Sequence, residues 1–200
     1  CYMIEGDIRE ATSQYLTALD ATSKSGDSEA YLTNCSSLGV AYRRINLPDS
    51  ALYYYGKGLE AAMKSKDYSA VSNLHANIAV MYISFKQLEN AKEHAQEAIT
   101  YALKEEDALD WLQAYYICGS LLVKTGEYDQ AINYLHKAYG IASQQQSPRF
   151  RLKVLSALLP AFQATAQDDS VRYYLNVCDR FLDELPETSP VSYTHLTLPT

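Results

Sequence analysis

Apolar and polar residues alternate along the chain with the period of an amphipathic helix. In residues 30–44, apolar or small side chains recur at three- and four-residue steps, at Leu32, Cys35, Leu38, Gly39 and Tyr42. Such spacing marks one face of a helix. The turn INLPD follows, and its proline suits a first helical turn, where its missing N–H costs nothing. A second amphipathic stretch covers residues 50–64. The pattern therefore predicts two helices joined by a short turn.

The helix pair recurs every forty residues. One small position is occupied by Ala11, Ala51, Ala91, Ala131 and Val171, and a second by Ala18, Gly58, Ala98, Ala138 and Cys178. Between these two positions lie Tyr15, Tyr55, Ala95, Leu135 and Leu175, and a mostly aromatic position runs through Tyr2, Tyr42, Tyr82, Leu122 and Phe162. We expect the small residues to let paired helices approach closely while the aromatic residues fill the gaps. The chain is therefore a repeat protein.

The boundaries between units share the same forty-residue period. Asp27, Asp67, Asp107 and Ser147 can each accept the free N–H groups that open a helix. They divide residues 1–190 into an array of five units at 1–26, 27–66, 67–106, 107–146 and 147–186, with the first and last truncated. Cys1 and Tyr2 then fall inside a first helix whose beginning is absent, so we expect the chain to be a fragment.

The repeat resembles the tetratricopeptide repeat (TPR) family. The residues that carry this resemblance are Leu38, Gly39 and Tyr42 in LGVAY, Gly126, Tyr128 and Ala131 in GEYDQA, and Gly6, Asp7 and Ala11 in GDIREA. The resemblance implies an all-α fold, an α-solenoid of antiparallel helix-turn-helix repeats that forms a right-handed superhelix. Forty residues exceed the common length of 34. The longer unit is similar to those in bacterial sensor and regulator proteins, including the aspartate-phosphatase regulators that bind signalling peptides.

Composition excludes several classes of function. A formal net charge of −7 argues against nucleic acid as a direct partner, because phosphate binding needs clustered Lys and Arg. The chain has no run of about 18 apolar residues, the length that would predict a transmembrane helix. The cysteines are far apart and suit a reducing bacterial cytoplasm, although a periplasmic location stays open.

The sequence predicts no catalytic, metal or cofactor site. Cys35, Cys118 and Cys178 fall on packing positions of the repeat, and His75, His94 and His136 have no ligand partner four residues away. GKG at 56–58 lacks the rest of a phosphate-binding loop. Glu105, Glu106, Asp107 and Asp110 surround a helix start, where the helix dipole favours acidic residues. We therefore expect that this part of the protein is not an enzyme and takes no cofactor.

The family resemblance implies a binding groove lined by the first helices. The groove positions map to Thr33, Ser36, Ser37, Val40, Arg43 and Arg44, then Asn73, Asn77, Val80 and Ser84, then Tyr116, Ser120 and Lys124, and then Lys153, Ser156 and Gln163. Only Arg44, Asn77 and Lys124 match the family's clamp for chaperone tails, so we expect a different extended peptide or partner loop. We predict a protein-interaction module, the sensory or scaffold arm of a larger regulator. The alternative is the regulatory half of a signalling enzyme, a histidine kinase or a peptide-responsive phosphatase. Oligomeric state is open.

The last ten residues, VSYTHLTLPT at 191–200, fit no phase of the repeat. They can be back-translated to the transposase adapter used in preparing sequencing libraries. A native strand is the alternative, but it would have no pairing partner in a helical stack. We interpret the tail as a translated adapter and leave it out of the fold.

Overall fold

The computed structural model describes residues 2–184, with side chains described over 8–167 and 169–177. These residues form nine α-helices and no strand, which confirms the predicted all-α fold. Cys1 and the tail at 191–200 lie outside the described residues. The side chains of Tyr2 and Cys178, both predicted to pack between helices, also lie outside them.

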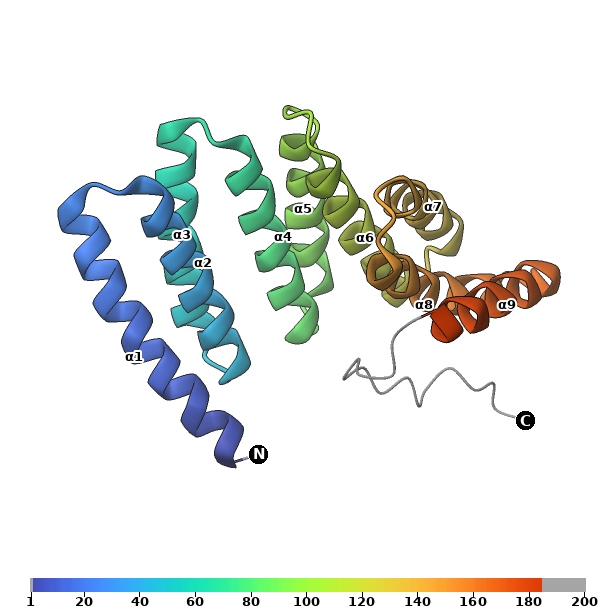
Figure 1. The fold of residues 1–200 in the computed structure, drawn as a ribbon, viewed down its shortest axis with the longest axis horizontal. Coiled ribbons are helices and arrows are strands. Elements are labelled where there is room, and N and C mark those ends of the chain that lie inside the picture. Colours follow the sequence, from blue (N-terminus) through green and yellow to red (C-terminus); the bar gives the residue numbers. More distant parts are fainter. Residues whose placement is uncertain (1, 185–200) are drawn as a thin grey trace. The chain divides into compact units, whose positions relative to one another are not determined.

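Nine helices follow one another through short turns (Figure 1). Their bounds are α1 Tyr2–Ser25, α2 Ser28–Arg44, α3 Pro48–Ser65, α4 Tyr68–Ser84, α5 Leu88–Ala102, α6 Ala108–Thr125, α7 Tyr128–Gln144, α8 Pro148–Ala164 and α9 Asp168–Glu184. The chain forms two compact units, residues 1–117 and residues 118–200, which we call unit 1 and unit 2. The boundary falls within α6.

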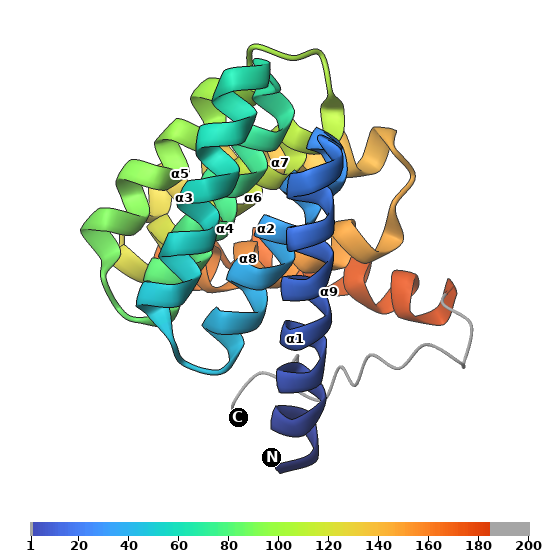
Figure 2. The ribbon, with the colours of Figure 1, turned by 90° about the vertical axis from the view of Figure 1, so that its left-hand side faces the viewer.

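Helices that follow one another in the chain pack against each other within each unit. In unit 1, α2 contacts α1 and α3, and α4 contacts α3 and α5. The helices α3, α4 and α5 lie side by side in both ribbon views (Figures 1 and 2). A further contact joins α2 to α4, the first helices of neighbouring repeats. In unit 2, α8 contacts both α7 and α9.

Acidic side chains open the first helices of three repeats. Asp27 and Asp67 accept the N–H groups of the residues three positions later, at 3.0 and 2.9 Å. The carboxylate of Asp107 accepts the N–H of Leu109 at 2.7 Å. Ser147 precedes α8, but its side chain makes no capping hydrogen bond. Pro148 follows it and lacks an N–H, so the opening turn of α8 has one donor fewer to satisfy.

The turns reverse direction through residues in the left-handed backbone region. Seven positions have φ between 50° and 81°: Gly26, Asn46, Lys66, Lys86, Gly126, Gln146 and Ala166. They recur every twenty residues, one after each of the helices α1 to α8 except α5, after which position 106 has no such residue. In five of these turns the residue is not glycine, although glycine adopts this conformation without the steric cost of a Cβ atom.

We expect that Ala166→Gly stabilises the protein. Ala166 has φ 53° and an exposed side chain, so glycine removes the Cβ penalty without losing a packing contact. The free energy of unfolding should rise by roughly 0.5–1 kcal/mol. The matched opposite change is Gly126→Ala, at φ 81°, which should lower it by a similar amount. Urea denaturation of both variants measures the two effects, and shifts of the same sign would contradict this account of the turns.

Helix α1 is continuous through Gly6. This glycine lies forty residues before Asn46, which forms a turn between two helices, and the family pattern places a turn at the same position. The structure instead keeps the backbone hydrogen bonds of this stretch within one helix.

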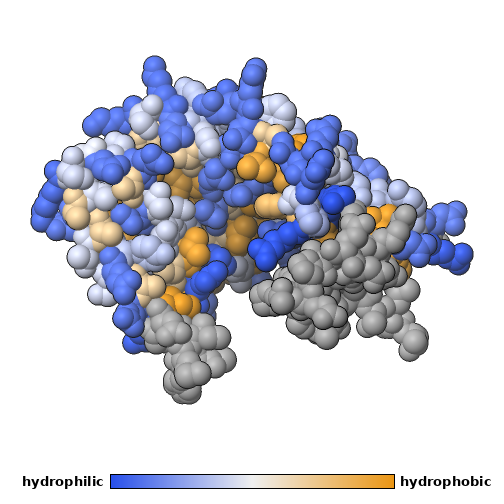
Figure 3. All heavy atoms as spheres, viewed as in Figure 1, coloured by the Kyte–Doolittle hydropathy of each residue, from blue (hydrophilic) through white to orange (hydrophobic). Residues whose placement is uncertain are grey.

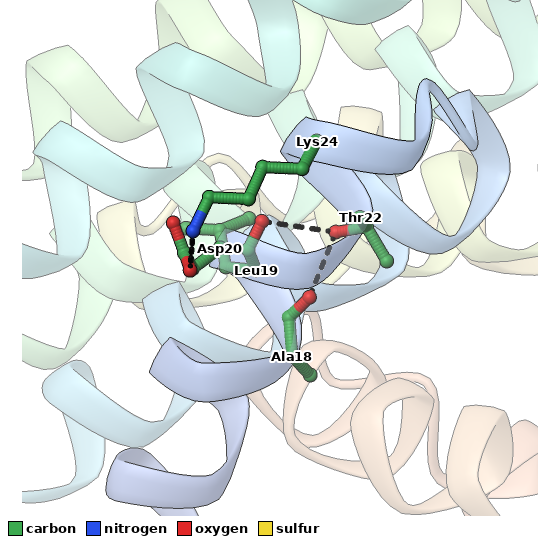
Figure 4. A network of polar contacts seen from close by, with 5 residues as sticks. All are labelled: Ala18, Leu19, Asp20, Thr22 and Lys24. Carbon is green, nitrogen blue, oxygen red and sulfur yellow. Dashed lines mark hydrogen bonds and ion pairs between the residues drawn. The ribbon is translucent and has the colours of Figure 1, made fainter.

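The last turns of α1 are supported by local contacts. Lys24 Nζ lies 2.6 Å from the carboxylate of Asp20, one helical turn earlier (Figure 4). The hydroxyl of Thr22 donates to the carbonyl groups of Ala18 and Leu19 at 3.0 and 3.1 Å. Both partners of the ion pair are largely exposed, so its contribution to stability is small.

The repeated small positions lie at the helix contacts. Ala51, Ala91, Ala131, Ala98 and Ala138 are fully buried, as are Tyr55, Leu38 and Leu135. Gly39, Gly58, Leu122 and Phe162 are also buried, while Tyr42, Tyr82, Ala11 and Ala18 are half-buried. Tyr15 departs from the expected packing and is 36% exposed. Among the described helices α1 contacts only α2, so the position that buries Tyr55 is open on one side in α1.

The connection between α5 and α6 is longer than the other turns. Helix α5 ends at Ala102, and residues 103–107 lead to α6. The indole N–H of Trp111 is shared between the carbonyl groups of Ala102, at 2.8 Å, and Glu105, at 3.0 Å. Trp111 therefore closes the end of α5 with a side chain in place of the left-handed turn.

Candidate functional site

Two adjoining pockets in unit 1 form a groove over α2. The first has a volume of about 330 Å³ and is lined by Ile8, Ala11, Tyr15, Ser36, Ser37, Val40, Ala41 and Arg44. The second has a volume of about 250 Å³ and is lined by Leu32, Thr33, Ser36, Ser37, Ala70, Asn73 and Leu74. Because Ser36 and Ser37 line both, the pockets adjoin along α2. We call the two together the unit 1 groove.

The groove combines apolar walls with polar side chains at intervals. Its apolar surface comes from residues such as Val40 and Leu74, and its polar groups are hydroxyl, amide and guanidinium. On the face of unit 1 that Figure 3 presents, hydrophobic residues show in small areas between hydrophilic ones. Such a surface suits a ligand that has both main-chain polar groups and small apolar side chains.

Hydrogen bonds hold two of the asparagines predicted at groove positions, of which Asn73 lines the second pocket and Asn77 lines neither. Asn77 Nδ2 donates to the Ser36 hydroxyl at 3.3 Å, which links α4 to α2. Asn73 Nδ2 donates to Asp110 Oδ1 at 2.9 Å, which links α4 to α6. An amide has a second N–H and a carbonyl oxygen beyond these bonds. Each side chain therefore keeps capacity to bind a ligand beyond the hydrogen bond that it makes in the structure.

Arg43 and Arg44 differ in their surroundings. Arg44 is exposed and lines the first pocket. Arg43 is half-buried and lies near the phenol of Tyr55. Burial raises the pKa of Tyr55, and the positive charge of Arg43 offsets part of that rise. Arg44 is thus the guanidinium that the groove offers to a ligand.

The remaining predicted groove residues do not line the unit 1 groove. Tyr116 is half-buried in the part of α6 that belongs to unit 1. Ser120 and Lys124 belong to unit 2. The Ser120 hydroxyl is buried and has no hydrogen-bond partner among the described residues, and Lys124 is exposed.

Asp110 is buried, in contrast to the exposed residues of its acidic cluster. Its side chain is only 6% exposed, whereas Glu106 and Asp107 are open to solvent. One carboxylate oxygen accepts the bond from Asn73, and the other has no hydrogen-bond partner among the described residues. Asp110 is therefore not part of an exposed acidic surface at this helix start. Local charge could not reveal this, because the burying contact comes from the preceding repeat.

A pair of histidines joins α4 to α5. His75 Nδ1 lies 2.9 Å from His94 Nδ1, so one neutral ring donates and the other accepts. Burial and the neighbouring His94 lower the pKa of His75 to about 4, and burial also lowers the pKa of His94. Tyr101 stacks on His75, and Tyr82 stacks on His94. The repeat register held a signal for this packing, since the position of His94 is occupied by Tyr54, Tyr134 and Tyr174 in three of the other four repeats and by Gln14 in the first.

The cysteines and acidic residues form no reactive centre in the described part of the chain. Cys35 and Cys118 are buried free thiols. Burial raises the pKa of both, and that of Cys118 reaches about 11, so each stays a protonated thiol at neutral pH. Among residues with described side chains, no three His, Cys, Asp or Glu residues lie close enough together to hold a metal ion. Within the same residues, no helix is long and apolar enough to cross a membrane.

Solved structures share this arrangement of helices. The chain is similar to BtubC (BKLC) from P. vanneervenii, with 19% identity and a TM-score of 0.79, over 99% of this chain and 82% of that one. A putative kinesin light chain from Podosopora anserina with nearly identical TPR-like repeats matches over 92% of this chain and 90% of that one, with 17% identity and a TM-score of 0.68. At these identities the likeness shows the fold.

A third similar structure is aspartyl phosphate phosphatase F from Bacillus subtilis. It matches over 83% of this chain and 44% of that chain, with 16% identity and a TM-score of 0.66. No curated protein sequence matches the chain significantly.

The family comparison identifies the repeat itself. Residues 72–105 and 112–145 each match the tetratricopeptide repeat model. Each segment begins inside a first helix and includes the second helix, as the forty-residue register predicts. The solved structures extend the same fold over nearly the whole chain. Two segments of the chain thus match the tetratricopeptide repeat, and the fold over nearly the whole chain is an α-solenoid of helix-turn-helix units.

Proposed function

We propose that the chain is a protein-interaction module that binds an extended segment of a partner protein in the unit 1 groove. Solenoids of stacked helix pairs commonly bind partners along such continuous surfaces. The observation that carries the proposal is that the two pockets adjoin, with Ser36 and Ser37 lining both. An extended segment has an N–H and a carbonyl group at every residue, which the serine hydroxyls and asparagine amides can pair.

Arg44 and Asn73, which line the pockets, are the principal contacts in this proposal. The Asn73 amide binds main-chain groups of the ligand, Asn77 holds the Ser36 hydroxyl, and Arg44 receives an acidic side chain. Arg43, Tyr116, Ser120 and Lys124 remain predicted groove positions. They have no part in the contacts proposed for the unit 1 groove.

The test begins with a selection from a displayed library of random decapeptides, using the full chain as bait. A fluorescein-labelled decapeptide recovered by the selection is then titrated by fluorescence anisotropy. Ser37→Trp fills the junction of the two pockets and should weaken binding at least about tenfold. The control Ser23→Trp places the same side chain at an exposed position of α1 outside both pockets. Failure to enrich any peptide, or unchanged binding by Ser37→Trp, would overturn the proposal.

We further propose that this module is the sensory or scaffold arm of a larger bacterial regulator. The alternative, the regulatory half of a signalling enzyme, draws support from the likeness to aspartyl phosphate phosphatase F, which extends over 44% of that protein. The full-length coding sequence distinguishes the two. A DNA-binding or other output domain in the same gene favours the regulator, and a kinase core or a phosphatase-type helical bundle favours the enzyme.

A further inference from the structure

The second pocket of the unit 1 groove has a buried negative charge directly behind its wall. Asn73 lines that pocket and donates to Asp110 Oδ1 at 2.9 Å. Asp110 is 6% exposed, and its Oδ2 atom has no hydrogen-bond partner among the described residues. A carboxylate has about four acceptor positions, and a single neutral amide satisfies one of them.

Such a carboxylate is costly to bury unless it is paired. Taking an ionised carboxylate out of water costs several kcal/mol, which one neutral hydrogen bond does not recover. No Lys or Arg lines the second pocket. The residue that separates Asp110 from the pocket is an asparagine, whose side chain can rotate about two torsions. A cationic N–H donor in the pocket could then bond to Asp110 and to the amide oxygen of Asn73.

We infer that the unit 1 groove selects peptides with a lysine or arginine side chain, which enters the second pocket and pairs with Asp110. This inference rests on the proposed function and names the ligand class for the same groove. The net charge of −7 favours a basic ligand in general. The buried carboxylate of Asp110 directs the basic side chain of that ligand to the second pocket. Desolvated charge pairs set specificity more strongly than exposed ones.

The groove also fixes the spacing within the ligand. Arg44, in the first pocket, lies eleven residues after Thr33, or about 16 Å along the axis of α2. Thr33 and Asn73 both line the second pocket, on neighbouring helices whose axes are about 10 Å apart. The two ends of the groove are therefore about 19 Å apart, the length of about six residues of extended chain. In the peptide, the acidic residue that binds Arg44 should thus lie about six residues along the chain from the basic residue that pairs with Asp110.

The experiment compares peptides selected by three full-length proteins. The wild type, Asp110→Asn and Glu106→Gln are each used as bait for the same displayed decapeptide library. Asp110→Asn removes the buried charge at nearly constant shape, and Glu106→Gln removes an exposed charge four residues earlier. Circular dichroism melting establishes that each bait is folded. We expect a lysine or arginine at one fixed peptide position for the wild type and Glu106→Gln, and its loss for Asp110→Asn.

Titration of one selected peptide, acetylated at its N-terminus, tests the pairing directly. Replacing its basic residue by norleucine should weaken binding to the wild type at least about tenfold, and binding to Asp110→Asn less than about threefold. Acetylation excludes the terminal ammonium group as the cation. Peptides without a basic position would overturn this inference and leave the groove intact. A basic preference that survives Asp110→Asn would also overturn it. Failure to recover any peptide would overturn both the groove and this inference.

Discussion

Gly39→Ala is expected to lower the free energy of unfolding by about 2–3 kcal/mol, although alanine is the better helix former. Gly39 is buried in α2, where a Cβ atom would overlap the ring of Tyr55 and lie 2.6 Å from Cζ. Tyr55 is fully buried in the core of unit 1, so its ring cannot move into solvent. The added methyl group must displace α3 or force the tyrosine from its preferred rotamer.

The matched control is the same substitution at Gly56. This glycine is exposed in α3, and a Cβ atom there would meet nothing within 4 Å. Gly56→Ala should raise the free energy of unfolding by roughly 0.5–1 kcal/mol through helix propensity alone. Urea denaturation measures both variants. A stabilising effect of Gly39→Ala would refute the close approach of α2 to α3.

A double variant assigns the effect to one contact. Tyr55→Leu removes the ring that Gly39 accommodates and should itself destabilise the core. If the ring is the obstacle, adding Gly39→Ala to Tyr55→Leu should cost much less than adding it to the wild type. Equal costs in the two backgrounds would place the strain elsewhere in α2.

Acidification should destabilise the protein through His75 and His94. Both have pKa values lowered in the folded state, that of His75 from 6.5 to about 4. Below pH 6.5 the unfolded chain therefore binds more protons than the folded one. The stability that this pair contributes is complete above about pH 6.5 and is lost as the pH falls towards about 4. Glu93 and Glu97 moderate the shift at His94.

His75→Phe tests this contribution while it keeps an aromatic ring against Tyr101. Between pH 7 and pH 5 the wild type should lose roughly 1–2 kcal/mol through this pair, allowing for partial exposure of the rings. The variant should lose correspondingly less over the same interval. Urea denaturation at both pH values gives the two losses. Identical losses would mean that the histidines do not couple protonation to folding.

Local signals in the sequence were sufficient for the helices and their starts. Asp27 and Asp67 cap the helices that follow them, because capping depends on residues only three positions away. The forty-residue series also predicts which helices pair, since each repeat packs mainly against its neighbours. These features need no knowledge of distant contacts.

Contacts between helices account for what the sequence could not predict. The pairing of His75 with His94 and the burial of Asp110 both depend on how one helix lies against another. Nothing in the residues next to Asp110 distinguishes it from exposed Glu106. Gly6 shows the converse, because it is in register with the turn residue Asn46 but lies inside the continuous helix α1.

Trp111 gives the protein an internal optical probe. It is the one tryptophan in the chain, and its indole bonds the end of α5 through Ala102 and Glu105. Its fluorescence therefore reports on the packing of this single connection, whereas circular dichroism averages over every helix. Heating or denaturing the protein while recording both signals separates opening of the α5–α6 connection from loss of helix throughout the array, without any added label.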